Sequence, residues 1–524
     1  MGLNRRNFLQ QAGLTLFTLG ATDTGINILS RQDKLPSSIE PYLRALAQTN
    51  NRKLALLVGI NQYSANNYLD GCLTDLELQR ELLIHRFGFQ PEDVLTLSEK
   101  QATREGIETA FNEHLGKQAK AGDIVIFHFS GYGSQVKLSP SSQDEEKTFE
   151  TKLINSLVPV DGIKSAKDAA VGNYLSLETL NYLGRSLDTD KLTMILDTSF
   201  IPVPDSYQGN FKIRSWKNIA TNFSAEELNF KEQLAAELNK GILNFGKKNS
   251  ALPGMTLSAA GKDRVAVEYK GNNFSTGLFT YALTQYLWQI TPASKIQVTL
   301  QKTGEEIETL VGSKQKPTLT GKSKPLFTYY LIPNRTDSAE GIVIDKDDKN
   351  AIELMLTGLP LKVIDNYGVN SCFSLVPTKE STEEQGIEEL IWLQIRGIEG
   401  LTAKTQFLNK ENSLEDIEIG QLAQEVIRVL PQTLGLSVAL DNSLSRIERV
   451  DATSAFANVA TVTNVANKGE RNADYLLGKI TQSIPESTDT DSTKEADTQP
   501  KESTQQKAYG LFSFSGEIIE KTVG

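Results

Sequence analysis

The 524-residue chain has only two cysteines and three histidines. So few cysteines exclude a disulfide framework, a cysteine-rich zinc module and an iron–sulfur cluster. The histidines, His85, His114 and His128, leave little material for a histidine-rich metal site. Long apolar runs are also lacking, so we expect no ordinary transmembrane helix. With 54 basic against 65 acidic residues the net charge is −11, which disfavours nucleic-acid binding because phosphates require a basic face.

Paired arginines, Arg5 and Arg6, stand near the start of the chain, and a short apolar run from Leu14 to Gly20 follows them. This order is typical of a twin-arginine export signal. We predict that residues 1–35 are such a signal or an N-terminal anchor, directing the chain to the periplasm or the thylakoid lumen. An ordinary amphipathic first helix is the alternative interpretation, and the chain is cytoplasmic if the signal is not used.

From Lys53 onward, buried strands alternate with helices. Continuous apolar runs lie at 54–60, 124–129 and 192–196, and residues with helical spacing separate them. A run that is apolar at every position is typical of a strand buried on both faces, and the β-α-β order favours a mostly parallel sheet. Ligands of such sheets bind beyond the carboxyl ends of the strands, which is where we look for chemistry.

The rest of the chain divides by composition. We predict one domain over 50–332, comprising a larger half (50–200), a loop-rich linker (200–250) and a smaller half (250–332). Residues 340–465 are predicted to form a smaller α+β module with one helix near Ile417–Leu430. Residues 483–507 are rich in Ser, Thr, Asp, Lys and Glu, and this composition predicts disorder.

Four motifs follow the predicted strands in order. They are Val58-Gly59-Ile60-Asn61-Gln62-Tyr63, Asp70-Gly71-Cys72-Leu73-Thr74-Asp75, Ser130-Gly131-Tyr132-Gly133-Ser134 and Asp197-Thr198-Ser199-Phe200. Together they resemble those of the caspase-like cysteine peptidases, in particular the metacaspases and their bacterial relatives, the orthocaspases. The resemblance covers about residues 52–330 and implies a caspase-like α/β/α sandwich. The twin-arginine start is also similar to that of cyanobacterial members.

The resemblance assigns a histidine base and a cysteine nucleophile to two positions that carry Tyr132 and Ser199 here. Serine needs a base to take its proton, and tyrosine is protonated at neutral pH, so the substituted pair is a poor catalyst. We interpret the neighbouring His128 as a structural histidine. Cys72 belongs to the motif before the second helix, and we interpret it as a buried structural thiol.

The resemblance implies that Asp75 and Asp197 form an acidic pocket for an Arg or Lys side chain of a peptide. A pair of carboxylates suits a guanidinium. The plainer alternatives are a solvated helix residue for Asp75 and a structural carboxylate at a strand end for Asp197. Members of the family are often processed after a basic residue in the linker, and this linker carries Lys212, Arg214, Lys217 and Lys231.

Calcium is often required in metacaspases and is held there by an acidic loop. The corresponding loop here has Asp144, Glu145 and Glu146 but lacks acids next to the following motif. Calcium needs several well-placed oxygen ligands, so we interpret this loop as solvated and expect no cofactor. Calcium binding by this poorly matched loop is the alternative.

We therefore predict a catalytically inactive caspase homologue that retains a pocket for Arg/Lys segments and has a binding or regulatory role. Its partners would be basic peptide or protein segments, or active caspase-like relatives, and we expect a monomer. The alternative is an active endopeptidase that cleaves after Arg or Lys with Ser199 as its nucleophile. A third hypothesis is that the last module carries the biological role and the caspase-like domain is a scaffold.

Overall fold

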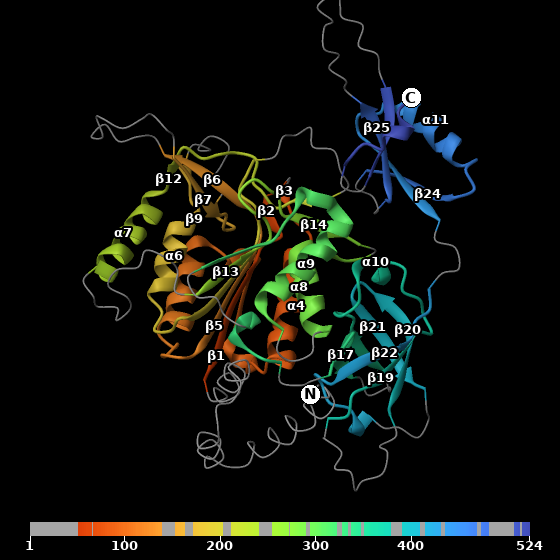
Figure 1. Ribbon diagram of the computed structural model, residues 1–524. Helices are drawn as coiled ribbons and strands as arrows, with labels where there is room; N and C mark the ends of the chain where they lie inside the picture. The colour runs from red at the N-terminus through yellow and green to blue at the C-terminus, as the bar shows by residue number, and fades with distance from the viewer. Residues whose placement is uncertain are drawn as a thin grey trace, which may run out of the picture. The chain divides into compact units, whose positions relative to one another are not determined.

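A computed structural model gives the fold of the chain (Figure 1). It describes residues 51–524, except 65–66, 139–151, 163–170, 203–210, 240–253, 272, 290–293, 322–326, 334–336, 347–350, 379–389, 409–413, 431–434, 469–472, 481–507 and 514–515. The predicted twin-arginine segment 1–35, the acidic loop Asp144–Glu146 and the predicted disordered segment 483–507 all lie outside the described residues.

A six-stranded sheet of order β16-β13-β10-β5-β1-β4 forms the centre of the first domain. Its five neighbouring strands β13, β10, β5, β1 and β4 are parallel, and only β16 runs antiparallel. The strands are β1 (Lys53–Gly59), β4 (Val94–Ser98), β5 (Ile124–Ser130), β10 (Lys191–Asp197), β13 (Met255–Ser258) and β16 (Thr318–Gly321). The predicted α/β architecture with a mostly parallel central sheet is confirmed.

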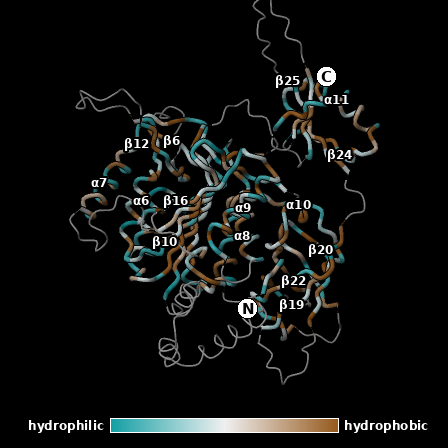
Figure 2. The backbone as a smooth tube through the Cα atoms, viewed as in Figure 1, coloured by the Kyte–Doolittle hydropathy of each residue, from teal (hydrophilic) through white to brown (hydrophobic). Residues whose placement is uncertain are grey.

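Both faces of this sheet are buried, as the continuous apolar runs predict. Along β1, Ala55 and Leu57 enter one hydrophobic cluster, whereas Leu54, Leu56 and Val58 enter another. This division follows from the alternation of side chains along a strand. Figure 2 shows hydrophobic stretches along these central strands.

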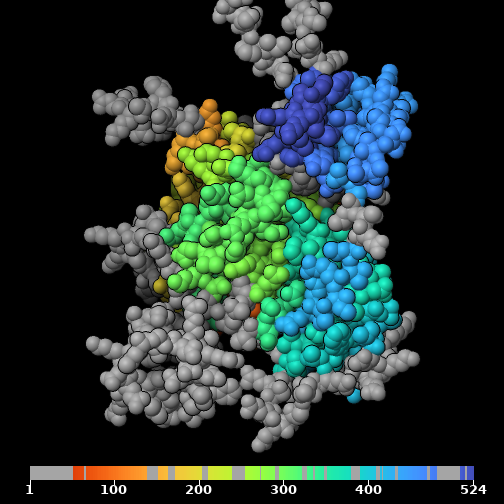
Figure 3. Space-filling model, turned by 45° about the vertical axis from the view of Figure 1, so that its right-hand side comes forward, coloured from red at the N-terminus to blue at the C-terminus, as the bar shows by residue number. Residues whose placement is uncertain are grey.

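Helices cover each face. The first cluster contains side chains of α4 (Cys72–Glu81), α8 (Leu278–Gln289) and α9 (Ile296–Val311). The second contains side chains of α5 (Arg104–Ala110), of its continuation η4 (Phe111–Gly116) and of α6 (Leu177–Arg185). In Figure 3 the green segment that includes α9 forms part of the outer surface, since α9 buries one side and exposes the other.

The linker between β10 and β13 contains more regular structure than the loop-rich composition predicts. Its described residues include β11 (Lys212–Ile213), β12 (Asn222–Phe223) and the 15-residue helix α7 (Ala225–Asn239). The domain also has short strands outside the central sheet: β2 (Gln62–Ser64), β3 (Asn67–Tyr68), β6 (Gly133–Leu138), β7 (Lys152–Leu157), β8 (Val171–Gly172), β9 (Leu175–Ser176), β14 (Val267–Lys270) and β15 (Ser275–Gly277). Among these, β11 pairs with β14.

Residues 340–465, predicted as one module, contribute to two separate sheets. The first is a closed barrel of β17 (Gly341–Lys346), β18 (Ile352–Met355), β21 (Thr402–Phe407), β20 (Trp392–Glu399), β19 (Cys372–Leu375) and β22 (Leu422–Ile427), with the short helix α10 (Leu361–Ile364). The second has the order β24-β23-β25-β26, from Val462–Asn467, Leu436–Leu440, Tyr475–Ile480 and Ala508–Ser513, and carries α11 (Arg446–Phe456).

The helix predicted near Ile417–Leu430 is wrong. Residues Leu422–Ile427 form β22, which pairs with both β17 and β19. The preceding Gly420 has φ of +87°, a left-handed conformation that ends any helical path. Pairing on both sides of β22 outweighs the local helix propensity of its glutamine, alanine and glutamate.

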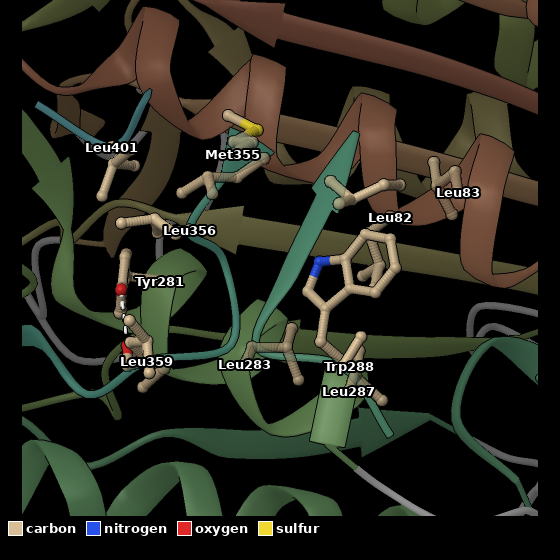
Figure 4. Close-up of a cluster of buried hydrophobic side chains, with 14 of the residues drawn as sticks. Leu82, Leu83, Tyr281, Leu283, Leu287, Trp288, Met355, Leu356, Leu359 and Leu401 are labelled. Atoms are coloured by element: carbon tan, nitrogen blue, oxygen red, sulfur yellow. Dashed lines mark hydrogen bonds between the residues drawn. The ribbon is translucent and has the colours of Figure 1, made fainter. Parts of the chain in front are cut away.

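The barrel and the first domain share one hydrophobic cluster (Figure 4). Trp288 of α8 is fully buried with Leu82 and Leu287, and Met355 and Leu356 of the barrel region belong to the same cluster. The phenol of Tyr281 donates a 2.6 Å hydrogen bond to the carbonyl oxygen of Leu359. Among the described residues, no helix combines the length and apolarity required to traverse a bilayer.

Candidate functional site

The candidate site lies at the carboxyl ends of β5 and β10. These strands are hydrogen-bonded neighbours, and their register sets Asp197, the last residue of β10, opposite Ser130, the last residue of β5. Asp75 reaches the same point from α4, where its carboxylate accepts the hydroxyl of Ser130. The sheet therefore brings together the two carboxylates that the family resemblance assigns to one pocket.

An arginine of the same chain fills this pocket. The Arg214 guanidinium lies 2.6 Å from Asp75 Oδ2 and 3.3 Å from Asp197 Oδ2, measured from Nη1. Its Nη2 lies 3.1 Å from an oxygen of Glu268. The Arg214, Asp75 and Asp197 side chains have no exposed surface, and Glu268 has 2%. The predicted pocket is thus occupied by a side chain of the same chain. Glu268 is a third acid, which the sequence analysis missed.

The start of α8 holds the two predicted carboxylates in position. Asp75 Oδ1 accepts the hydroxyl of Thr276 at 2.7 Å and the N–H of Gly277 at 2.9 Å. Asp197 Oδ2 accepts the N–H of Thr280 at 3.0 Å and its hydroxyl at 2.7 Å. Free N–H groups in the first turn of a helix favour a negative charge. Gly277 has no room for a side chain, because a Cβ there would lie 2.1 Å from Asp197 Oδ2.

The buried charges do not balance, since three carboxylates surround one guanidinium. Burial raises the pKa of Asp197 to about 6, although Arg214 acts in the opposite direction. Burial also raises the pKa of Glu268. For Arg214, burial disfavours the charge, but Asp75 and the other anionic neighbours outweigh it and hold the pKa well above its usual value. The arginine therefore stays charged and compensates the acids around it.

The backbone around Arg214 is bound as well. The segment enters as β11, antiparallel to β14, with Lys212 opposite Glu268 and Ile213 opposite Val267. The N–H of Arg214 continues this pairing to the Ala266 carbonyl at 2.9 Å. After Arg214 the chain runs beside β6, where the Trp216 N–H donates to the Gly133 carbonyl at 2.6 Å. The segment thus crosses the whole carboxyl edge of β5 and β10.

The carbonyl oxygen of Arg214 lies among four donors. It accepts the N–H of Ser199 at 2.9 Å and the N–H of Gly133 at 3.3 Å. The hydroxyl of Thr198 reaches it at 3.2 Å, and that of Ser199 at 3.4 Å. Converging N–H groups are the arrangement that stabilises the oxyanion in acyl transfer. The Arg214 side chain and its carbonyl oxygen are therefore each held by several partners at the carboxyl ends of β5 and β10.

Tyr132, at the predicted base position, is a packing residue. Its ring centroid lies 4.9 Å from that of Tyr63 and 5.5 Å from that of Trp216. The phenol makes a long 3.4 Å hydrogen bond to the carbonyl oxygen of Tyr68. Burial raises the pKa of Tyr132 far above its usual value, so the phenol stays protonated and does not accept a proton at neutral pH.

Neither His128 nor Cys72 is positioned to act as a base or nucleophile with Ser199. His128 Nε2 lies 3.2 Å from the hydroxyl of Thr280, and burial lowers the pKa of the imidazole to about 4. Thr280 also donates a hydrogen bond to Asp197, so His128 helps to position Thr280 against this carboxylate. Cys72 is fully buried, and burial raises the pKa of its thiol well above the usual value. Cys372 is buried in β19 of the barrel, and both cysteines are free thiols.

Within the described ranges, no three acidic, histidine or cysteine side chains gather in a geometry suited to a metal ion. The loop Asp144–Glu146, considered above for calcium, lies outside those ranges.

The chain is similar in sequence to several metacaspases. Metacaspase-1 of Meyerozyma guilliermondii is 36% identical over 105 residues, which are 19% of this chain and 26% of the relative. Metacaspase-1B of Aspergillus clavatus is 27% identical over 232 residues, 42% of this chain and 50% of the relative. The chain therefore spans at most half the length of either relative. Among solved structures, caspase-1 of Spodoptera frugiperda matches with a TM-score of 0.28 and 10% identity, covering 52% of this chain and 86% of that one.

The family model described as the caspase domain matches residues 52–327. This range contains the whole central sheet and every residue of the site described above. Since the match spans more than half of the 524 residues, the chain belongs to the caspase family.

Proposed function

We propose that this chain is a non-catalytic caspase homologue whose cleft binds arginine in the manner of a substrate and holds its own Arg214 there. The observation that carries the proposal is that Arg214 is bound at two points. Its guanidinium forms ion pairs with three acids, and its carbonyl oxygen accepts the N–H groups of Ser199 and Gly133. A binding or regulatory role toward basic segments, or toward active relatives, follows from a cleft that retains recognition.

Loss of chemistry follows from the surroundings of Ser199. A serine becomes a nucleophile when a base accepts its proton as it attacks. Among the described residues, the Ser199 hydroxyl has one hydrogen-bond partner, the Arg214 carbonyl oxygen at 3.4 Å. Tyr132 is held protonated, and His128 faces Thr280. The groups that bind are present, and a group that takes the proton is lacking around this hydroxyl in the described part of the chain.

An active endopeptidase with Ser199 as nucleophile is the competing function. The observation in its favour is the set of donors on the Arg214 carbonyl, because such donors can account for several kcal/mol of transition-state stabilisation, about 3–4 per donor. A nucleophilic serine would still need a base, so this candidate ranks second.

A peptidase assay on the full chain distinguishes the two functions. Fluorogenic peptides ending in Arg or Lys are incubated with the wild-type chain and with Ser199→Ala, with and without calcium. We expect equal, background-level hydrolysis in all cases, and an unchanged intact mass of the chain. Hydrolysis by the wild-type chain that disappears in Ser199→Ala would overturn the non-catalytic function.

A further inference from the structure

We infer that the cleft contains a second basic subsite, formed by Tyr68 and Asp70, and that it recognises extended segments with the spacing Lys-x-Arg. The inference rests on the proposed function, since it treats β11 as the cleft's ligand. The subsite recognises the residue two positions before the arginine, which Asp75 and Asp197 do not contact.

The geometry of Lys212 defines the subsite. Its Nζ lies 2.6 Å from Asp70 Oδ2 and 3.7 Å from the centroid of the Tyr68 ring. The same ammonium group donates to the Tyr68 carbonyl oxygen at 3.3 Å. A carboxylate, a carbonyl oxygen and an aromatic face around one ammonium group are a complete set of partners for a cation.

The spacing follows from the extended backbone. Residues i and i+2 of a strand project from the same face. Lys212 therefore contacts Asp70 before α4, while Arg214 contacts Asp75 within α4. Pairing of β11 with β14 fixes the register, and Ile213 projects to the other face, where it packs against the large hydrophobic cluster. A shift by one residue would place an apolar side chain on the acids, so the cleft selects the spacing as well as the charge.

The two subsites are joined by one carboxylate. Glu268 binds Arg214 with one oxygen at 3.1 Å, and its other oxygen accepts the backbone N–H of Asp70 at 2.8 Å. Asp70 in turn binds Lys212 through its side chain. Occupying the arginine pocket therefore helps to hold Asp70 in position for the lysine.

The lysine subsite is the weaker of the two. Lys212 and Asp70 side chains each keep 35% of their surface exposed, whereas the arginine pocket is closed to solvent. Half-exposed ion pairs and cation–π contacts contribute modestly, and together they should change affinity by about five- to tenfold.

Peptide binding to a chain that lacks the two basic side chains of β11 tests the inference. The full-length double variant Lys212→Ala with Arg214→Ala removes both side chains from β11, and circular dichroism and thermal unfolding verify its fold. Two peptides are compared by calorimetry: Phe-Lys-Ile-Arg-Ser-Trp, which has the sequence of residues 211–216, and the same peptide with alanine in place of lysine.

The lysine peptide should bind about five- to tenfold more tightly than the alanine peptide. Adding Asp70→Asn should remove most of that difference, and adding Asp263→Asn, at an exposed aspartate after β13, should leave it unchanged. Equal affinity of the two peptides overturns the lysine subsite and leaves the arginine pocket intact. Binding of neither peptide to a folded variant overturns the cleft as a Lys-x-Arg receptor without bearing on hydrolysis.

Hydrogen exchange provides a second test if the double variant does not fold. Exchange of the Arg214 amide is measured in Asp70→Asn, in Lys212→Ala and in the chain with both changes, with Arg214 intact. Each single change should accelerate exchange by about fivefold, and the combination should add little, because both remove the same contact. Unchanged exchange, or fully additive effects, overturns the inference.

Discussion

The carbonyl oxygen of Arg214 accepts the backbone N–H of Ser199 at 2.9 Å. This hydrogen bond joins the residue at the position that the resemblance assigns to the nucleophile with the residue that fills the acidic pocket. The Gly133 N–H reaches the same oxygen at 3.3 Å. Under the proposed function, the peptide bond between Arg214 and Ser215 corresponds to the scissile bond of a substrate.

Restoring the histidine and cysteine that the resemblance implies should lead to cleavage of the peptide bond after Arg214. In the double variant Tyr132→His with Ser199→Cys, we expect cleavage after Arg214, because the carbonyl already faces its donors and a thiolate with an adjacent imidazole supplies the missing nucleophile. Intact-mass spectrometry should show fragments 1–214 and 215–524. Tyr132→Phe with Ser199→Cys is the matched control without a base and should stay uncut. A folded histidine–cysteine variant that stays intact, or is cut elsewhere, would contradict the assignment of the scissile position.

Removing the guanidinium should cost much of the chain's stability. Arg214→Ala leaves Asp75, Asp197 and Glu268 buried without their cation, and breaking a buried ion cluster in this way costs about 3–5 kcal/mol. Urea unfolding at neutral pH measures the loss. Arg264→Ala removes a half-buried arginine after β13 and should change stability by no more than about 0.5 kcal/mol. An equal decrease of the free energy of unfolding in both variants would mean that the Arg214 cluster does not contribute more to stability than an ordinary half-buried arginine.

Stability should also depend on pH through Asp197. Its pKa is about 6 in the folded chain against an ordinary value of 3.8, so between these values the folded state binds more protons than the unfolded state. Ionisation of Asp197 therefore lowers stability as pH rises from about 4 to 6, and the cost persists above that range. Relative to wild type, Asp197→Asn should gain up to about 3 kcal/mol over this interval.

The measurement is urea unfolding at pH 4, 5, 6 and 7. Asp263→Asn, at an exposed position, serves as the control and should show a constant difference from wild type. If the difference between Asp197→Asn and wild type stays constant with pH, or moves in favour of wild type, Asp197 does not have a raised pKa.

Tyr132 should act through its ring. Tyr132→Phe keeps the contacts with Tyr63 and Trp216 and loses only a 3.4 Å hydrogen bond, so stability should change by less than about 0.5 kcal/mol. Tyr132→Ala loses both ring contacts and should cost about 1–3 kcal/mol. It should also make the segment around Trp216 more sensitive to limited proteolysis. Equal behaviour of the two variants would show that the ring does not secure this segment.

The sequence was informative where a local pattern or a motif carries the information. Continuous apolar runs predicted β1, β5 and β10 with both faces buried, and the family resemblance brought Asp75 and Asp197 to one pocket. Arg214 was recognised only as a basic residue of the linker. Its position depends on pairing of β11 with β14, more than 50 residues away in sequence, and a two-residue strand has no periodicity to reveal it.

Glu268 and the barrel were missed for related reasons. Glu268 of β14 follows the apolar residues 265–267 and has no local feature that marks it as a ligand of a distant arginine. The barrel strands are short, and Leu422–Ile427 contains residues that also favour helices, so only its two strand partners decide its conformation.

Arg214 follows Ser199 by 15 residues in the same chain. A ligand tethered this closely acts at an effective concentration on the order of millimolar, independent of how dilute the protein is. A separate peptide with the same intrinsic affinity must therefore approach millimolar concentration before it fills half of the clefts. Under the proposed function, a separate basic segment displaces Arg214 mainly when the chain between Ser199 and Arg214 is lengthened, cut or pulled away. The abundance of such segments has less effect.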